Sequence, residues 1–407
     1  MQNFMSQIFS NEAIRQILKL LKRNFDRKLF PPGIVLSNRA QSISKFISYT
    51  SQPYRGPREK FDPSNMKICW IIPDFIAGAG GHMTIFRIAN KLESFGHDVT
   101  FFIQNPSVHR SGKDAAATIN THFQPFLGKV ELLDAELPII EGDALIATDF
   151  FSCYPVRALA GFRRKFYLVQ DYETLFHPMG ARSLLAEDTY TMGFDCLCAG
   201  DWLADIIRQR FNGWAMSWPL AFDPDVYFPR REGTRSERRI AFYSRFFTER
   251  RAVELGMIAL DILYSRGERF HVDFFGYPVT GLKVRYPYTD HGVLSPSALG
   301  DLYRSADLGV VFSATNHSLV NREMMACELP VIDLDIDSVR RVFPDNAVWR
   351  VKPSPEAIAD GIQHLLNSRA CREKLTAGGL AHIEGLSWEK SARLIESALA
   401  ERIAEKA

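Results

Sequence analysis

The sequence predicts an α/β protein made of two doubly wound domains, each a parallel sheet with helices on both faces. Short apolar runs alternate with helical segments from about residue 66, and this alternation stops near residue 220 and restarts near residue 239. Continuous apolar runs of this kind are typical of parallel strands, which are buried on both faces. With 407 residues, the chain has room for two or three ordinary domains.

The first series of elements starts with an apolar run at residues 67–72, which we expect to be a buried strand. A glycine cluster follows, and then residues 83–95, where apolar side chains recur on one helical face before Gly96. Further strands are expected at residues 99–103, 144–148, 165–169 and 195–199, with a helix at residues 202–211.

The second series follows a polar stretch rich in proline and aspartate, which predicts a boundary between domains. We expect strands at residues 239–243, 272–275, 308–312, 330–334 and 347–351, and helices at residues 251–265, 296–305, 319–327, 355–367, 370–384 and 387–405. The expected organisation is an N-terminal extension at residues 1–65, a first domain at 66–220, a linker at 221–238, a second domain at 239–386 and a last helix at 387–407. Two Rossmann-like domains in tandem place a cleft between them, at the carboxyl ends of both sheets.

Composition and charge exclude several classes of function. The formal net charge is only +2, so we expect no nucleic-acid partner. Of the six cysteines only Cys196 and Cys198 are close together, and their spacing fits neither a zinc site nor a redox motif. Cysteines within apolar runs are typical of reduced, buried thiols, which favours a cytoplasmic location.

The first 30 residues predict a basic amphipathic helix. Apolar side chains recur at helical spacing from Ile14 to Leu29, with lysines and arginines between them. Such a helix either lies on an anionic membrane, here the inner face of the cytoplasmic membrane, or packs on protein, and both alternatives stay open. No apolar run reaches the roughly 18 residues of a membrane-spanning helix, and no signal peptide is expected. The sequence leaves the oligomeric state open.

The glycine cluster at residues 78–82 lies between the first strand and its helix. Gly80 and Gly81 would let the backbone approach a ligand closely, and the start of a helix favours negative charge. Met83 stands where a dinucleotide-binding motif needs a third glycine, which argues against a nicotinamide-dependent dehydrogenase. A tight turn without a ligand is the alternative.

A cluster of arginines follows the first strand of the second domain. Arg245 comes directly after this strand, and Arg250 and Arg251 start the next helix. Guanidinium groups that converge at a helix start bind a diphosphate well, through charge-assisted hydrogen bonds. The alternative is an exposed basic helix face, but the position at the end of a central strand favours the diphosphate.

Carboxylates complete the expected cleft. Glu323 starts an apolar helix, where it either accepts hydrogen bonds from both hydroxyls of a ribose or only complements the helix dipole. Asp171 and Glu173 follow the strand at residues 165–169, and we expect one of them to orient or deprotonate an acceptor hydroxyl. For Glu173, a turn with a solvated acid is an equal alternative.

These motifs resemble those of retaining glycosyltransferases of the GT-B fold, in glycosyltransferase family four. The matching positions are Gly80, Gly81, Arg245, Arg250 and residues 221–229, 302–307 and 323–332. In that family the glycines open the first helix, an Arg and a Lys hold the diphosphate, and a Glu pair precedes the final segment. The likeness covers about residues 66–400. It implies a nucleotide-sugar donor, a glycan acceptor, no metal or organic cofactor, and a last helix that crosses back to the first domain.

Two departures from the family bear on the donor sugar. The first Glu of the pair falls on Thr315, and the glycine-rich sugar loop is replaced by residues 316–318. Loss of a carboxylate acceptor suggests a sugar with a different hydroxyl pattern, or a deoxy sugar. Together with residues 170–173, these departures resemble the rhamnan-synthesis (WsaF-type) rhamnosyltransferases, which use dTDP-β-L-rhamnose to extend envelope polysaccharides.

The site expected from these motifs has a donor side and an acceptor side. The donor side is Gly80, Gly81, Arg245, Arg250, Gly276, Thr315, Asn321 and Glu323; the acceptor side is Asp171 and Glu173; the catalytic residues are Asp171 and Arg245. Asp333 and Asp335 resemble a metal-binding pair, but an acidic loop at a strand end is the favoured interpretation, and we expect no metal. The alternatives are a hexosyltransferase that uses a UDP- or GDP-sugar, a nucleotide-sugar epimerase, and a non-catalytic glycan-binding protein.

Overall fold

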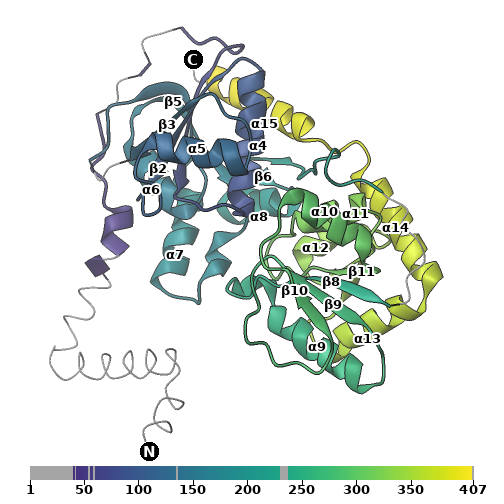
Figure 1. The fold of residues 1–407 in the computed structure, drawn as a ribbon. Helices are drawn as coiled ribbons and strands as arrows, with labels where there is room; N and C mark the ends of the chain where they lie inside the picture. The colour runs from purple at the N-terminus through teal and green to yellow at the C-terminus, as the bar shows by residue number, and fades with distance from the viewer. Residues whose placement is uncertain are drawn as a thin grey trace, which may run out of the picture. The chain divides into compact units, whose positions relative to one another are not determined.

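The computed structural model describes residues 40–41, 43–53, 56–57, 60–133, 136–229 and 237–405 (Figure 1). The amphipathic helix expected within residues 1–30 lies outside these described residues. Residues 1–50 and 51–407 form separate compact units, and both sheets belong to the second. In the first unit, residues 40–41 and 43–47 are helical. Within the described ranges, every helix falls short of the length and apolarity that a membrane crossing needs.

The first sheet has seven strands in the order β3-β2-β1-β4-β5-β6-β7, and all of them run parallel. The strands are β1 (Lys67–Pro73), β2 (Asp98–Gln104), β3 (Lys129–Leu133), β4 (Glu141–Ala147), β5 (Gly161–Val169), β6 (Asp195–Ala199) and β7 (Ala215–Trp218). Its helices are α4 (Gly80–Ser94), α5 (Gly112–His122), α6 (Phe150–Ala158), α7 (Ala181–Asp188) and α8 (Asp201–Phe211). The strand order reverses between β1 and β4, and open α/β sheets bind their ligands at the carboxyl ends of strands at such a point.

The second sheet has six parallel strands in the order β10-β9-β8-β11-β12-β13. The strands are β8 (Arg239–Tyr243), β9 (His271–Phe275), β10 (Tyr288–Asp290), β11 (Leu308–Val310), β12 (Val331–Leu334) and β13 (Val348–Val351). The helices are α9 (Val253–Ser265), α10 (Pro296–Ser305), α11 (Val320–Ala326), α12 (Asp337–Val342), α13 (Pro355–Asn367), α14 (Arg369–Ile383) and α15 (Trp388–Ala404). The order reverses between β8 and β11, so this sheet has a switch point of its own.

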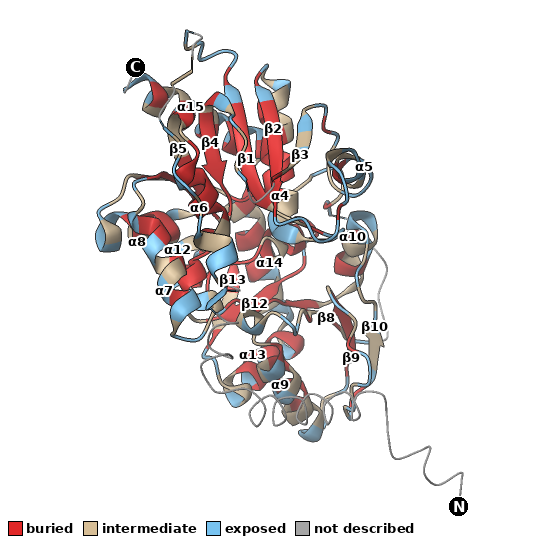
Figure 2. Cartoon of the chain, turned by 90° about the vertical axis from the view of Figure 1, so that its left-hand side faces the viewer, coloured by how far each residue is buried: buried red, intermediate tan, exposed pale blue. Residues whose placement is uncertain are grey.

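Burial explains why the sequence revealed most strands. The inner strands of both sheets are mostly apolar and mostly buried, and Figure 2 shows those of the first sheet largely in red. For β6, β8, α10 and α13 the expected bounds are confirmed to the residue, and most other expected elements are confirmed with ends shifted by one to three residues. The predicted fold class, two parallel sheets each covered by helices, is therefore confirmed.

The elements that sequence reasoning missed lack the periodicity on which it relied. Strand β3 is at the sheet edge, and its residues alternate between exposed and partly buried positions. Helix α6 contains Pro155, which normally ends a helix, and its start depends on a reciprocal capping box between Asp149 and Ser152. Strand β3 forms because it pairs with β2, and helix α6 forms because the capping box stabilises its first turn.

The last helix, α15, packs on the first domain. Trp388, Ile395 and Leu399 are buried in the same apolar core as strands β1 and β4. Near its end, Arg402 donates through Nε and Nη2 to Asp195 of β6, at 3.0 and 3.2 Å. Figure 1 shows α15 beside α4 of the first domain, with which it is in contact. The chain therefore crosses back to the first domain after it has completed the second.

We predict that Gly276→Ala destabilises the protein more than Gly267→Ala does. Both glycines have positive φ, +101° and +93°, so both substitutions carry the strain of a left-handed Ala, about 1 kcal/mol or more. A Cβ at Gly276 would also stand 2.5 Å from Cε2 of Tyr243, whereas nothing lies within 4 Å at Gly267. Urea unfolding of the two variants measures the difference, and equal losses would contradict the steric argument.

Candidate functional site

The two domains meet where strands of both sheets end. Asp171 follows β5 of the first sheet, and its Oδ2 accepts a hydrogen bond from Oγ1 of Thr315, at 2.9 Å, in the loop that follows β11. Its Oδ1 accepts from the backbone N–H of Asn316 at 3.0 Å and from that of Tyr172 at 2.8 Å. Asp171 is thus a buried carboxylate shared between the domains, and burial raises its pKa.

The loop after β11 inserts a side chain between two strand ends of the first domain. Nδ2 of Asn316 donates to the carbonyl oxygens of Gln170, at 2.8 Å, and Ala199, at 3.3 Å, which end β5 and β6. His317 lies next to Gly200, whose φ of +104° and missing Cβ leave room for the imidazole ring. The residues that distinguish this chain from the family motif therefore make contacts between domains.

Arginines of the second domain line the same place. Nε of Arg250 lies 3.4 Å from Oδ2 of Asp171, and its guanidinium is 4.0 Å from the centre of the Phe176 ring. Arg251 donates through Nη1 to Oγ of Ser313 at 2.5 Å, and its charge also acts on Asp171. Burial lowers the pKa of Arg250, and the neighbouring arginines lower it further. Two guanidinium groups therefore converge on one carboxylate.

Arg245, which we expected to bind the leaving diphosphate, lies just after the end of β8. Its guanidinium lies 4.8 Å from the centre of the Phe247 ring, and its charge acts on Arg250. Phe247 is 52% exposed and packs edge-on against Tyr277. Arg245 therefore combines with the arginine cluster electrostatically, beside an exposed group of aromatic rings.

Gly80 and Gly81 form the first turn of α4 with ordinary φ values. A Cβ at Gly80 would meet no atom within 4 Å, and one at Gly81 would stand 3.6 Å from the side chain of Gln170. The packing of the described residues thus does not require glycine at Gly80. Helix α4 also begins without a side-chain cap, so its first N–H groups are open to a ligand.

Glu323 lies on α11 and is only 6% exposed. Tyr227, from the segment that joins the domains, donates a hydrogen bond to its carboxylate. Burial raises the pKa of Glu323 to about 7, while the charge of Arg87 opposes the rise. At neutral pH this carboxylate is therefore close to its titration point.

Asn321 and Gly276, also expected on the donor side, have structural partners. Nδ2 of Asn321 donates to Asp333 at 3.0 Å, and its Oδ1 is buried with no hydrogen-bond partner in the described part of the chain. Gly276 has a positive φ and lies against Tyr243, so the fold itself requires a glycine there. Asp335 pairs with Arg340 at 2.7 Å, which separates it from Asp333.

The charge of Glu173 acts on Asp171 and on Arg250, but its carboxylate is bound within the first domain. Glu173 is only 5% exposed, and its Oε2 accepts a hydrogen bond from the backbone N–H of Phe150 at 2.7 Å. Burial raises its pKa well above the ordinary value, and the nearby Asp149 adds to the rise. The expectation of a solvated turn or of a cleft-facing acid at Glu173 is corrected accordingly: its side chain is internal to the first domain.

Sequence reasoning missed several residues that the fold brings to the site. Phe176 carried no signal, because it acts through Arg250 of the other domain. Asn316 was noticed only as part of the altered loop at residues 316–318, and its contacts with the first domain were not expected. Arg87 did carry a signal, as a single basic residue within the apolar stretch of α4, and it is buried. A lone charge in such a stretch indicates a partner that folding supplies.

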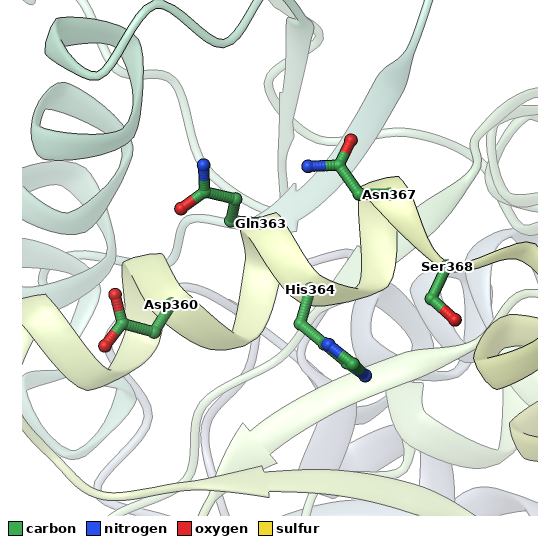
Figure 3. Close-up of a pocket in the computed structure, with 5 residues that line it drawn as sticks. All are labelled: Asp360, Gln363, His364, Asn367 and Ser368. Carbon is green, nitrogen blue, oxygen red and sulfur yellow. The ribbon is translucent and has the colours of Figure 1, made fainter.

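A hollow lies beside helix α13, and we assign no function to it. Figure 3 shows Gln363 and Asn367 projecting from one side of the helix and His364 from the other. Both amides donate to Oε1 of Glu268, at 3.1 and 3.0 Å, and the His364 ring stacks on Trp349. These polar groups therefore satisfy one another.

Comparisons with known proteins show what the chain is similar to in sequence and in fold. Residues 238–363 match the family described as "WsaF, C-terminal domain". The O-antigen biosynthesis protein RfbC of Myxococcus xanthus is 31% identical over 340 residues, which cover 79% of this chain and 26% of that protein. The chain spans about a quarter of the length of RfbC, and its matches span between about a quarter and a half of the length of the other curated relatives.

Solved structures share the fold at low sequence identity. Anabaena HepE in complex with UDP and glucose has a TM-score of 0.64 and 12% identity, with 82% of this chain and 99% of that chain covered. Sucrose-phosphate synthase from Thermosynechococcus elongatus has a TM-score of 0.61 and 14% identity, with 83% and 99% covered. The two sheets and these neighbours show the GT-B glycosyltransferase fold, and the family match shows that residues 238–363 are similar to the C-terminal domain of WsaF.

Proposed function

We propose that this protein is a glycosyltransferase of polysaccharide biosynthesis that transfers a sugar from a nucleotide-sugar donor to a glycan acceptor. The observation that carries the proposal is the group formed by Asp171, Thr315, Arg250 and Arg251 where the two sheets end. It unites a carboxylate for the acceptor with guanidinium groups for a leaving diphosphate. The match to a domain of WsaF and the similarity to an O-antigen biosynthesis protein support it.

In the proposed mechanism, fixed charges stabilise the leaving group. Arg245, Arg250 and Arg251 offset the negative charge that develops on the diphosphate as the glycosidic bond to the donor breaks. The uncapped start of α4 at Gly80 adds backbone N–H donors from the other domain. Arg250 contacts Asp171, so a phosphate that binds Arg250 would exchange one anionic partner for another.

Asp171 is the proposed acceptor-side residue. Burial raises its pKa, which brings a carboxylate closer to the strength of a general base near neutral pH. Its hydrogen bonds from Thr315 and Asn316 hold it at the domain boundary, where an acceptor hydroxyl would meet the donor sugar. To act as a base, Asp171 must give up one of these hydrogen bonds when the acceptor hydroxyl binds.

The proposed donor is dTDP-β-L-rhamnose. Thr315 and residues 316–318 are all uncharged at neutral pH, so this loop lacks the acceptor-only carboxylate that a fully hydroxylated hexose would use. A 6-deoxy sugar presents one hydroxyl fewer and fits such a loop better. A thermal-shift screen of dTDP-, UDP- and GDP-sugars, followed by mass analysis of products with an acceptor glycan, tests both donor and reaction. Epimerised donor, or binding without transfer, would contradict the proposal.

Arg245→Ala is expected to lower kcat about 100-fold or more, because a positive charge near the leaving diphosphate is lost. Release of the nucleoside diphosphate in a coupled assay measures the effect. Arg285→Ala is the matched control, since Arg285 is an exposed arginine whose partner is Asp261. Activity near wild type in Arg245→Ala would rule out its role.

Gly80→Ala is expected to weaken donor binding without harming the fold. A Cβ there meets no protein atom, and Ala in a helix is more stable than Gly by about 0.5–1 kcal/mol. The same methyl group would stand in the path of a phosphate that approaches the helix start. Calorimetric titration with the nucleoside diphosphate and urea unfolding measure the two effects separately, and an unchanged Kd would contradict this placement of the diphosphate.

Transfer is expected to proceed at full rate in excess chelator, because guanidinium groups supply the charge that a divalent cation would otherwise supply. The rate with and without added Mg²⁺ is the measurement. A rate that depends on Mg²⁺ would refute the arginine mechanism.

A further inference from the structure

We infer that Arg87 of the first domain is a positioning residue for the donor: it holds Glu323 of the second domain in place for the ribose and links it to helix α4. This inference rests on the proposed function and on the expectation from the sequence that Glu323 accepts hydrogen bonds from the hydroxyls of the nucleoside sugar. It assigns a specific task to a buried arginine that the diphosphate cluster does not use.

Arg87 is a buried cation with unused donors. It is 4% exposed, and its Nη2 forms an ion pair with Asp223. Nε and Nη1 are buried with no hydrogen-bond partner in the described part of the chain. The guanidinium also lies 5.0 Å from the centre of the Trp388 ring, where α15 begins. Burying a guanidinium whose N–H donors lack partners costs several kcal/mol of folding free energy. The ion pair with Asp223 alone therefore does not explain why an arginine occupies this position.

The groups around Glu323 come from four segments of the chain. Arg87 on α4 favours its charged form, and Asp223 opposes it. Tyr227 donates a hydrogen bond, and the charge of Glu323 also acts on Tyr303 of α10 and on Cys327 after α11. Arg87 is the one cation of this set, so it alone favours the carboxylate through charge.

A short series of contacts connects the two residues. Glu323 accepts from Tyr227, the backbone N–H of Tyr227 donates to the carbonyl of Asp223 at 2.9 Å, and the Asp223 carboxylate pairs with Arg87. Arg87 lies two turns after Gly80 on the same helix. One helix of the first domain therefore supports the donor at both the diphosphate and the ribose.

The chemical need for Arg87 follows from burial. A carboxylate accepts a hydrogen bond from the 3′-hydroxyl of the deoxyribose of dTDP, or from both hydroxyls of the ribose of UDP, whereas a protonated carboxyl group gives up part of that capacity. With the pKa of Glu323 at about 7, neutral pH leaves much of it protonated unless a cation intervenes. Removing Arg87 raises the pKa of Glu323 further. As the pH falls, nucleotide binding that requires the carboxylate is therefore lost at a higher pH than in the wild type. Removing Asp223 acts in the opposite direction.

The test compares Arg87→Met, Arg87→Lys and Asp223→Asn with the wild type by calorimetric titration with dTDP and UDP between pH 6 and pH 9. In wild type, affinity falls as the pH drops through the pKa of Glu323, and Glu323→Gln abolishes this step. We expect Arg87→Met to move the midpoint up by about one pH unit, which weakens binding about fivefold at pH 7 and little at pH 9. Arg87→Lys keeps the wild-type midpoint, and Asp223→Asn lowers it.

The outcomes separate this inference from the function on which it rests. A wild-type protein that binds no nucleoside diphosphate would overturn both. Nucleotide binding whose pH midpoint stays unchanged in Arg87→Met and in Asp223→Asn would overturn the inference alone and leave a purely structural ion pair. If Arg87→Met fails to fold, a midpoint that does not fall in Asp223→Asn still overturns it, because that variant keeps the arginine.

Discussion

The buried carboxylate of Asp171 is the contact on which the arrangement of this molecule depends. It belongs to the first domain, yet two of its hydrogen bonds and its ion pair come from Thr315, Asn316 and Arg250 of the second. A buried carboxylate is costly unless it is fully matched, so the loop after β11 and the arginine cluster must lie where they do. The positions of the candidate acceptor and donor groups follow from this one requirement.

The loop at residues 315–318 shows how a change in a motif acquires a second meaning in three dimensions. As sequence, it suggested an altered donor sugar, because a carboxylate was missing. In the structure, Thr315 and Asn316 bind Asp171, Gln170 and Ala199 across the domain boundary. The nearby carboxylate of Asp171 comes from the other domain and is already bound by Thr315 and Asn316. In the proposed function, sugar specificity and domain contact depend on the same few side chains.

Buried ionisable groups are concentrated along the boundary. Glu323 and Asp333 both have pKa values raised to about 7 by burial, and the pKa of Asp171 is raised as well. Asp333 is held by Asn321 and by two backbone N–H groups, which suits a structural role. Glu323 instead shares its surroundings with Tyr227, Asp223 and Arg87, which connect three parts of the chain. Clusters of this kind are more frequent at functional sites than elsewhere.

The sequence by itself determined the fold class, most of the strands and the turn at Gly80 and Gly81, because apolar periodicity and glycine act locally. It also placed Arg245 after a strand and Arg250 at the start of the next helix. Only the tertiary structure decided that Glu173 lies inside the first domain, that Arg87 belongs near the site and that Asn316 connects the two domains. Whether an acid faces a cleft depends on the neighbouring strands and on the other domain, and no local pattern encodes contacts between residues more than a hundred positions apart.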